Sequence, residues 1–349
     1  GQRMTQQDYL KQVEAALGNT DEATRGEILE DLTQHFLIGL KQGKTEEEII
    51  TSLGDVSQFE NLDDFPQAKK EEKPVDQKTD EMIEGTQRSI FVDAGYADIH
   101  VVHSKDNAHH VYLIKDGVTM ENSYLLEKKV ENSELRIRMT TSNRFFHVFD
   151  RDLQIRLEVA SAAMNLNIGT ASGDIELKDL TLDELLLSTA SGDMQLSALN
   201  ARNLRLHSAA GDMVLKTVAG SINIDTASGD VDVDQHRGDS FTMKSANGDL
   251  NYRGSVKEMR LHGASSDGVL NLDQVERLMI ETVSGDYRIH LAAQVSGVKL
   301  DFKGISGTCE YAVLGQTGKL DGRLGKTTLG DGKVDIDLRC ISGDFSIEN

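Results

Sequence analysis

Aspartate is the residue with the clearest chemical pattern in this sequence. It recurs about every nineteen residues, at Asp174, Asp193, Asp212, Asp230, Asp249, Asp267, Asp286 and Asp344. Glycine-aspartate repeats bind Ca²⁺ in one class of parallel roll, but that class places two glycines and an aspartate in a unit of about nine residues. One carboxylate per longer unit supplies too few oxygen atoms to surround an ion. We therefore expect these aspartates to accept backbone N–H groups in turns, with no metal or cofactor bound.

Histidine is the second residue type that could form a metal or acid–base site, because His100, His103, His109 and His110 lie close together in sequence. His109 and His110 are adjacent, so in a strand their side chains face opposite ways. They also follow Ser-Lys-Asp-Asn-Ala, and we interpret the group as a solvated turn. The sequence contains no nucleophile elbow, Walker loop, His-Glu-x-x-His or Cys-x-x-Cys motif. We predict that the protein is not an enzyme.

The aspartates are positioned by a repeated turn, in which Thr-Ala-Ser-Gly-Asp at residues 170–174 recurs at residues 189–193. The turn glycines are Gly173, Gly192, Gly211, Gly229, Gly248, Gly285, Gly307, Gly325 and Gly343, and Ser266 takes the place of one glycine. A unit this short cannot bury its own apolar face. The repeat therefore predicts a solenoid, in which successive units stack on one another.

The residues between the turns indicate the kind of solenoid. Apolar or small side chains alternate before a turn, as at Leu185, Leu187 and Thr189, and again after it, as at Met194 and Leu196. A period of two on both sides of a turn is typical of strand, turn, strand. We predict an all-β parallel β-solenoid, or β-helix, with about 18–19 residues per coil. We expect each turn glycine to adopt a positive φ angle, which glycine tolerates best.

The two ends of the predicted solenoid domain, residues 88–349, differ from each other. We interpret residues 88–160 as irregular N-terminal strands and residues 161–349 as regular coils stacked in chain order. In the last coil, Phe345 and Ile347 continue the inward column, with no later segment to cover them. An open strand edge pairs readily with another chain. We therefore predict an interface at Phe345 and Ile347, most simply in a homodimer.

The start of the chain has a helical period instead. Ile28, Leu32 and Phe36 recur at four-residue spacing, and Thr45 with Glu48 forms the capping box of a later helix. We predict a small all-α helical bundle over residues 4–63. Residues 64–87 contain many Lys, Glu, Asp and Gln but few apolar residues, so we expect a flexible linker there.

Charge and composition limit the partners and the compartment. The 37 Lys and Arg against 58 Asp and Glu give a net charge of −21, which disfavours nucleic acid and favours a protein or cationic peptide. No apolar run reaches the roughly 20 residues of a membrane span, and the start lacks the pattern of a signal peptide. The two cysteines, Cys309 and Cys340, suit a reducing compartment. We expect a cytoplasmic protein by default, with association with the membrane or cell surface as the alternative.

Two parts of the chain resemble known families. The segments YLKQVEAAL and EILEDLTQHFLIGLKQGKTEEEIITSLGD resemble the HAAS signalling domain of Firmicutes. Residues 89–349, with their repeated Ser-Gly-Asp units, resemble the bacterial β-strand-repeat domains called putative adhesins. The overall plan is similar to that of LiaX-type envelope-stress proteins of Gram-positive bacteria, which implies a role in the response to cationic antimicrobial peptides.

These observations favour a non-enzymatic regulatory or binding protein of the Gram-positive envelope-stress response. Its helical domain would signal, and its solenoid would present a surface to cationic antimicrobial peptides or to a membrane sensor. A surface adhesin or an envelope structural protein is the alternative. A carbohydrate-active solenoid enzyme is the third hypothesis, and the absence of Trp argues against it, because such enzymes hold sugars on aromatic side chains.

Overall fold

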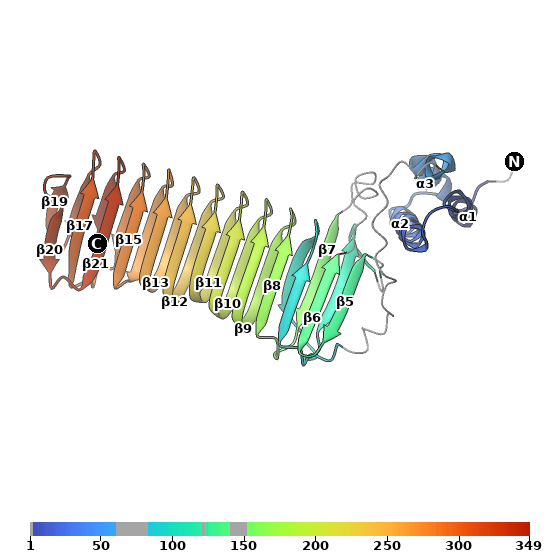
Figure 1. Cartoon of the computed structure of the whole chain (residues 1–349), viewed down its shortest axis with the longest axis horizontal. Coiled ribbons are helices and arrows are strands. Elements are labelled where there is room, and N and C mark those ends of the chain that lie inside the picture. The colour runs from blue at the N-terminus through green and yellow to red at the C-terminus, as the bar shows by residue number, and fades with distance from the viewer. Residues whose placement is uncertain (1–2, 61–82, 121–122, 124, 140–151) are drawn as a thin grey trace.

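The computed structural model of the chain describes residues 3–60, 83–120, 123, 125–139 and 152–349. A small helical domain is followed by a long stack of β-strands (Figure 1). The predicted fold class, a helical bundle followed by a parallel β-solenoid, is confirmed. Most of the predicted linker, residues 64–82, lies outside the described residues.

The helical domain contains α1 (Gln6–Ala16), α2 (Glu22–Lys41), α3 (Glu46–Leu53) and the 3₁₀-helix η1 (Val56–Phe59). The predicted capping box is confirmed, because the Glu48 amide donates to the Thr45 hydroxyl and the Thr45 amide donates to the Glu48 carboxylate. One apolar cluster holds the helices together, and it consists of Tyr9, Val13, Leu17, Ile28, Leu32, Phe36, Ile49, Leu53 and Phe59.

The strands of the solenoid fall into three groups along the chain. The N-terminal group is β1 (Ser89–Asp93), β2 (Asp98–His103), β3 (His110–Lys115), β4 (Val118–Met120), β5 (Leu126–Glu131), β6 (Glu134–Met139) and β7 (Leu153–Val159). The regular coils are β8 (Asn165–Thr170), β9 (Ile175–Thr189), β10 (Met194–Ser208), β11 (Met213–Thr226), β12 (Val231–Ser245), β13 (Leu250–Gly263), β14 (Gly268–Gln274), β15 (Arg277–Thr282) and β16 (Tyr287–Leu291). The C-terminal group is β17 (Gly297–Gly304), β18 (Cys309–Val313), β19 (Gln316–Leu320), β20 (Lys326–Gly330), β21 (Val334–Cys340) and β22 (Phe345–Glu348).

The strands form two continuous faces that share β9–β13, whose long strands run from one face into the other. One face has the order β5-β6-β1-β8-β9-β10-β11-β12-β13-β15-β21-β17-β20. The other has the order β4-β3-β7-β2-β9-β10-β11-β12-β13-β14-β16-β22-β18-β19. Neighbouring coils pair in parallel, so side chains at the same place in each coil form columns along the stack.

The space between the faces is filled by alternate side chains. Strand β10, for example, alternates buried and exposed residues over most of its length, as a half-buried strand should. His236 is a polar residue in the buried column that begins with Leu180, Leu199 and Val218. Its ring nitrogens lie 2.6 Å from the Tyr252 hydroxyl and 2.7 Å from the carbonyl oxygen of Gly220. Both ring nitrogens of His236 are therefore satisfied inside the core, as buried polar groups require.

Both ends of the stack have a chain order that differs from the prediction. The last coil, β21 with β22, is inserted between the coil of β15 and β16 and the coil of β17 and β18. Strands β19 and β20 then pair antiparallel outside β18 and β17. The prediction that regular coils continue in chain order to residue 349 is wrong. Gly325 accordingly lies in the turn between β19 and β20 and is not the corner of a further coil.

The first coil is likewise out of chain order. Strands β1 and β2 pair directly with β8 and β9 on one side and with β6 and β7 on the other. Antiparallel strands again lie outermost, with β5 against β6 and β3 against β7. The irregular N-terminal strands predicted from the sequence therefore enclose one coil of the repeat and cap it.

A buried charged pair joins the helical domain to the solenoid. The Lys115 ammonium group at the end of β3 donates to the Asp31 carboxylate of α2. The Lys115 and Asp31 side chains are only 1% and 3% exposed. Two opposite charges buried together stabilise each other, and either one left alone would be costly.

Candidate functional site

The turn glycines are needed for space, and the expected positive φ angle is wrong. Gly173, Gly192, Gly211, Gly229, Gly248, Gly285, Gly307 and Gly343 all lie outside the positive-φ region. A Cβ atom built on Gly192 would lie 1.9 Å from the carbonyl oxygen of Gly173 in the preceding coil. The same overlap, 1.7–2.3 Å from the carbonyl oxygen of a neighbouring coil, occurs at the other seven glycines. Each corner glycine therefore lets two coils approach within strand-pairing distance.

Positive φ angles occur at the opposite bend of the regular coils. They are adopted there by Asp179, Ala198, Thr217 and Gln235, each six residues after a corner glycine. None of these four residues is glycine, so the sequence contains no signal that marks this bend. A left-handed residue recurs in the same place because stacked coils must bend at the same level.

Three residues before six of the eight corner glycines lies a Thr or Ser that fixes the corner, and Gly304 and Cys340 take this position before Gly307 and Gly343. The Gly192 amide donates to the Thr189 hydroxyl at 3.0 Å, and Ser208 accepts from Gly211 in the same way. The hydroxyl group is buried and closes the turn from inside. The local sequence thus combines a buried hydroxyl with a glycine that has room only for hydrogen.

In the coil that contains Ser266, the glycine and the hydroxyl residue of the corner have exchanged positions. Ser266 stands where other coils have glycine, and Gly263 stands where they have Thr or Ser. A Cβ atom on Gly263 would lie 3.1 Å from both the Cβ and the Oγ of Ser266. The Ser266 side chain therefore occupies the space left by the missing side chain at position 263.

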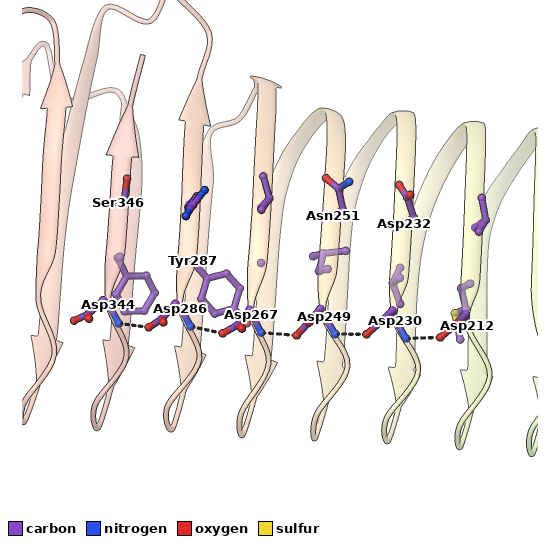
Figure 2. Close-up of a pocket in the computed structure, with 18 of the residues that line it drawn as sticks. Asp212, Asp230, Asp232, Asp249, Asn251, Asp267, Asp286, Tyr287, Asp344 and Ser346 are labelled. Atoms are coloured by element: carbon purple, nitrogen blue, oxygen red, sulfur yellow. Dashed lines mark hydrogen bonds between the residues drawn. The ribbon is translucent and has the colours of Figure 1, made fainter.

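The aspartates after the corners form a hydrogen-bonded row along the stack (Figure 2). The amide of each aspartate donates to Oδ1 of the aspartate in the neighbouring coil, at 2.8–2.9 Å. We call this set the aspartate row: Asp98, Asp174, Asp193, Asp212, Asp230, Asp249, Asp267, Asp286 and Asp344. The expectation that these carboxylates accept backbone N–H groups is confirmed, and the donor comes from the next coil.

Two members of this arrangement were missed by the sequence pattern. Asp98 begins the row, but it follows Ala97 rather than glycine; only its likeness to the repeat in Gly-Tyr-Ala-Asp-Ile indicated it. Thr308 ends the row, because its amide and hydroxyl groups both donate to Asp344 at 3.2 Å. The carboxylates therefore stop one coil before the last parallel coil.

The aspartate row borders a shallow groove of about 910 Å³ that runs across seven coils, from the coil of Asp212 to the coil of Thr308 and Glu310. Beside the row, outward-facing residues of the next strand position are Val214, Asp232, Asn251, Val269, Arg288 and Ser346. Tyr287 lies beneath the groove, over the space left by Gly268. Burial raises the pKa of Tyr287 above its ordinary value, and the charges of Asp267 and Asp249 raise it further.

Like charges at coil spacing repel one another appreciably. Neighbouring carboxylates about 4.8 Å apart repel by about 0.9 kcal/mol in bulk water, which exceeds the thermal energy of about 0.6 kcal/mol. At the start of the row, burial raises the pKa of Asp98, the Asp174 amide lowers it and the Asp174 charge raises it. A row of positive charges that follows the stack would relieve this repulsion along its whole length.

The predicted edge residues Phe345 and Ile347 are buried in the stack. They are 2% and 1% exposed, and β22 is paired on both sides, with Tyr287 opposite Phe345 on one side and Cys309 on the other. The prediction that these residues form an exposed edge is wrong, because β17 and β18 cover the last coil. A homodimer through them would require the covering strands to leave.

The other chemically notable residues do not come together as a site. His109 is buried, with Nε2 3.1 Å from the Gln87 carbonyl oxygen and Nδ1 accepting from the Ala160 amide, whereas His110 contacts Asp106 at the surface. Cys309 and Cys340 are free thiols, and burial raises the pKa of Cys309 to about 12. Within the described ranges, no group of three or more His, Cys, Asp or Glu is placed to hold a metal ion.

Comparison with known families agrees with both domains. Residues 87–348 match the family described as Toastrack DUF4097. The chain belongs to the Toastrack DUF4097 family. Residues 8–59 match the HAAS family, so a HAAS domain precedes the Toastrack domain. No curated protein matches the sequence.

A comparison with solved structures matched three proteins at low identity. A putative lipid binding protein from Parabacteroides distasonis has 16% identity and a TM-score of 0.46, over 76% of this chain and 93% of its own. A putative adhesin from Bacteroides fragilis has 14% identity and a TM-score of 0.37, over 75% and 94%. A putative cell adhesion protein from Clostridium sporogenes has 12% identity and a TM-score of 0.21, over 76% and 93%.

Proposed function

We propose that this Toastrack protein is a non-enzymatic regulator of the Gram-positive cell-envelope stress response. In this proposal the solenoid binds cationic antimicrobial peptides along the aspartate row, and the HAAS domain transmits the signal. The coarser role, binding or regulation, follows from the two domains. The observation that carries the finer proposal is the uninterrupted row of carboxylates, each fixed by the amide of the next coil.

The geometry favours an extended, multiply charged cation over a compact ion. Each Oδ1 atom is already engaged by a backbone N–H group, so a single coil offers little more than one outward carboxylate oxygen. A peptide that lies along the stack meets several such oxygens in succession. Binding should then be weak at each coil and strong in sum, and it should weaken steeply with salt, as it does whenever paired charges displace counterions.

The test is peptide binding to the full chain with the row neutralised. Asparagine keeps the Oδ1 acceptor and removes the charge, so a quadruple variant carries Asp212→Asn, Asp230→Asn, Asp249→Asn and Asp267→Asn. A matched control removes four exposed charges elsewhere, by Asp225→Asn, Asp239→Asn, Asp273→Asn and Glu276→Gln. Fluorescence anisotropy of a labelled oligolysine, titrated at several salt concentrations, measures affinity for both variants.

We expect the row variant to bind at least about tenfold more weakly than the control, with a shallower dependence on salt. Equal loss in the two variants would mean that only net charge matters and would contradict a specific site. An absence of oligolysine binding by the unmodified chain at low salt would refute the proposal outright. In a Gram-positive host, a cell-envelope stress reporter should respond to a cationic peptide with the unmodified chain and lose that response with the row variant.

The proposed location is the cytoplasm or the membrane-associated envelope. In the part of the chain that the structure describes, no helix is long and apolar enough to cross a membrane. Cell fractionation with an antibody against the solenoid separates this proposal from a surface adhesin. Antibody labelling of intact cells would favour the adhesin.

A further inference from the structure

A row of exposed apolar side chains appears only at the C-terminal end of the stack. Two residues before the corner glycine, six successive coils carry alanine: Ala171, Ala190, Ala209, Ala227, Ala246 and Ala264. The same column then continues through Val283, Ile341 and Ile305 in the last three coils. Backbone bonds join these levels, because the Ile341 amide donates to Val283 and the Ser306 amide donates to Ile341.

Exposure is greatest at the outermost levels. Val283 and Ile341 are 47% and 49% exposed, whereas Ile305 is 82% exposed. Leu324, in the turn between β19 and β20, is 64% exposed and lies beyond Ile305. We call these four residues the corner patch. Single exposed apolar residues are common on proteins, but a continuous row of large ones indicates a contact surface.

The charge around Ile305 and Leu324, the outer half of the patch, has the opposite sign to that of the whole chain. Residues 297–333 carry six Lys or Arg and four Asp or Glu, a net charge of +2, although the whole chain has a net charge of −21. The aspartate row has already ended, because Thr308 replaces the carboxylate in the Ile305 coil. Lys303 and Arg323 are exposed, and each adjoins a patch residue.

The antiparallel pairing of β17 with β20 places Lys303 and Leu324 at the same end of the stack. Asp301 is opposite Lys326, and the Phe302 amide donates to the Gly325 carbonyl. Leu324 lies two residues before Lys326, in the turn that leads into β20, and Lys303 lies two residues after Asp301, so both lie at the same end of the β17–β20 pair. An apolar residue and a basic residue therefore lie together at the end of the stack.

We propose that the corner patch docks the solenoid end to an anionic lipid bilayer surface. Ile305 and Leu324 would enter the interfacial region, while Lys303, Arg323 and Lys326 would contact lipid phosphates. Val283 and Ile341 line a shallow groove with Thr282 and Cys340, whereas Ile305 and Leu324 project from turns at the outermost levels. These two projecting side chains fit a deformable surface better than a rigid protein partner. A second copy is disfavoured, because a symmetric contact would bring the same basic side chains face to face.

This inference concerns a different surface from the aspartate row and does not depend on the proposed function. The acidic row does not prevent it, because charges further away than the Debye length of about 8 Å at physiological salt are largely screened. At about 4.8 Å per coil, only the nearest coils of the row lie within that distance.

Vesicle flotation of the full chain tests the proposal. We expect the chain to float with vesicles of phosphatidylcholine and phosphatidylglycerol and not with phosphatidylcholine alone. Ile305→Ser with Leu324→Ser should lower the bound fraction about tenfold, because both inserted side chains are lost. A control pair, Leu186→Ser with Leu40→Ser, removes exposed apolar side chains elsewhere and should leave binding unchanged.

A charge pair and a fluorescent probe complete the test. Lys303→Glu with Arg323→Glu should abolish flotation, whereas Lys216→Glu with Arg253→Glu on the coils should not. Because the chain has no Trp, Leu324→Trp provides a single probe whose emission should shift to the blue with anionic vesicles only.

Three results would overturn the proposal. The first is absence of flotation by the unmodified chain, and the second is flotation that the corner variants leave unchanged. The third is a dimer in light scattering that Ile305→Ser with Leu324→Ser dissociates, since it would assign the patch to a second copy. Circular dichroism spectra that match the unmodified chain would establish that each variant is folded.

Discussion

Replacing one corner glycine by alanine should strongly destabilise the solenoid. In Gly192→Ala the new Cβ would lie 1.9 Å from the carbonyl oxygen of Gly173 and 2.6 Å from its carbon. An unstrained carbon–oxygen contact is about 3.3 Å, so the overlap is about 1.4 Å. Rotation of a side chain cannot relieve this clash, because the new Cβ atom is fixed directly to the backbone and the oxygen atom belongs to the Gly173 backbone.

The two coils must therefore separate locally. Separation weakens the bond from the Asp193 amide to Asp174 Oδ1, now 2.8 Å, and the bond from the Ala190 amide to Ala171, now 3.1 Å. Overpacking costs about 1–3 kcal/mol and each weakened hydrogen bond about 1 kcal/mol. We expect the free energy of unfolding to fall by about 3–5 kcal/mol, measured by urea denaturation followed by circular dichroism.

Two glycine controls separate space from backbone conformation. Gly169 has no atom within 4 Å of a built Cβ and no positive φ, so Gly169→Ala should change stability by less than about 0.5 kcal/mol. Gly315 also has open space but a φ of 73°, so Gly315→Ala should cost about 1 kcal/mol from conformation alone. A Gly192→Ala loss no larger than that of Gly315→Ala would refute the close-contact explanation.

Four further perturbations test other features of the fold. Gly263→Thr should lower the free energy of unfolding by about 1–3 kcal/mol, because its Cβ crowds the Ser266 side chain, and adding Ser266→Gly should restore it, as urea denaturation can show. Tyr252→Phe should cost about 1–3 kcal/mol in the same assay, since it leaves a His236 ring nitrogen unpaired. Burial lowers the pKa of His236 below its ordinary value of 6.5, so the unfolded chain binds the proton more readily than the folded chain. The contribution of His236 to stability is therefore full above pH 6.5 and falls as the pH decreases below that value. Thermal melts across this pH range would detect the loss. Lys115→Met should release the helical domain, because it removes the ammonium group that pairs with the buried Asp31 carboxylate, and should speed tryptic cleavage between the domains.

Exposed counterparts serve as controls for these changes. Tyr96→Phe, at a tyrosine that is 60% exposed, and Lys216→Met should have little effect. If adding Ser266→Gly does not restore the stability of Gly263→Thr, the glycine and the hydroxyl residue have not simply exchanged positions in this corner. An unchanged cleavage rate in Lys115→Met would show that another contact holds the helical domain.

The repeat itself could be predicted from the sequence because each coil has the same requirements. A buried hydroxyl, a corner glycine and an aspartate recur at fixed offsets, and alternation on both sides identifies strands. The reason for glycine could not be predicted, since positive φ and lack of space both select it. Only the position of the Gly173 carbonyl beneath Gly192 distinguishes the two.

The order of the coils at the two ends could not be predicted, because it depends on which strands pair with the open edge of the parallel stack. The repeat aligns Gly285, Gly307 and Gly343 equally well in any stacking order. One signal was present: the spacing between Gly285 and Gly307 is 22 residues, the longest in the array. The extra length leads the chain past the space that the last coil later fills.

Antiparallel strands cover the parallel stack at both of its ends. A parallel coil with an open edge would invite another chain to pair with it. At each end the terminal coil instead lies one level inside, and short antiparallel strands form the outer edge. Strand β5 also carries Glu127, Lys128, Lys129 and Glu131, and such charges discourage further pairing. Because β22 is only four residues long, its burial between β16 and β18 is what holds it in place. Because the outer strands cover the last parallel coil, the turns are what the C-terminal end exposes, and the corner patch lies in these turns.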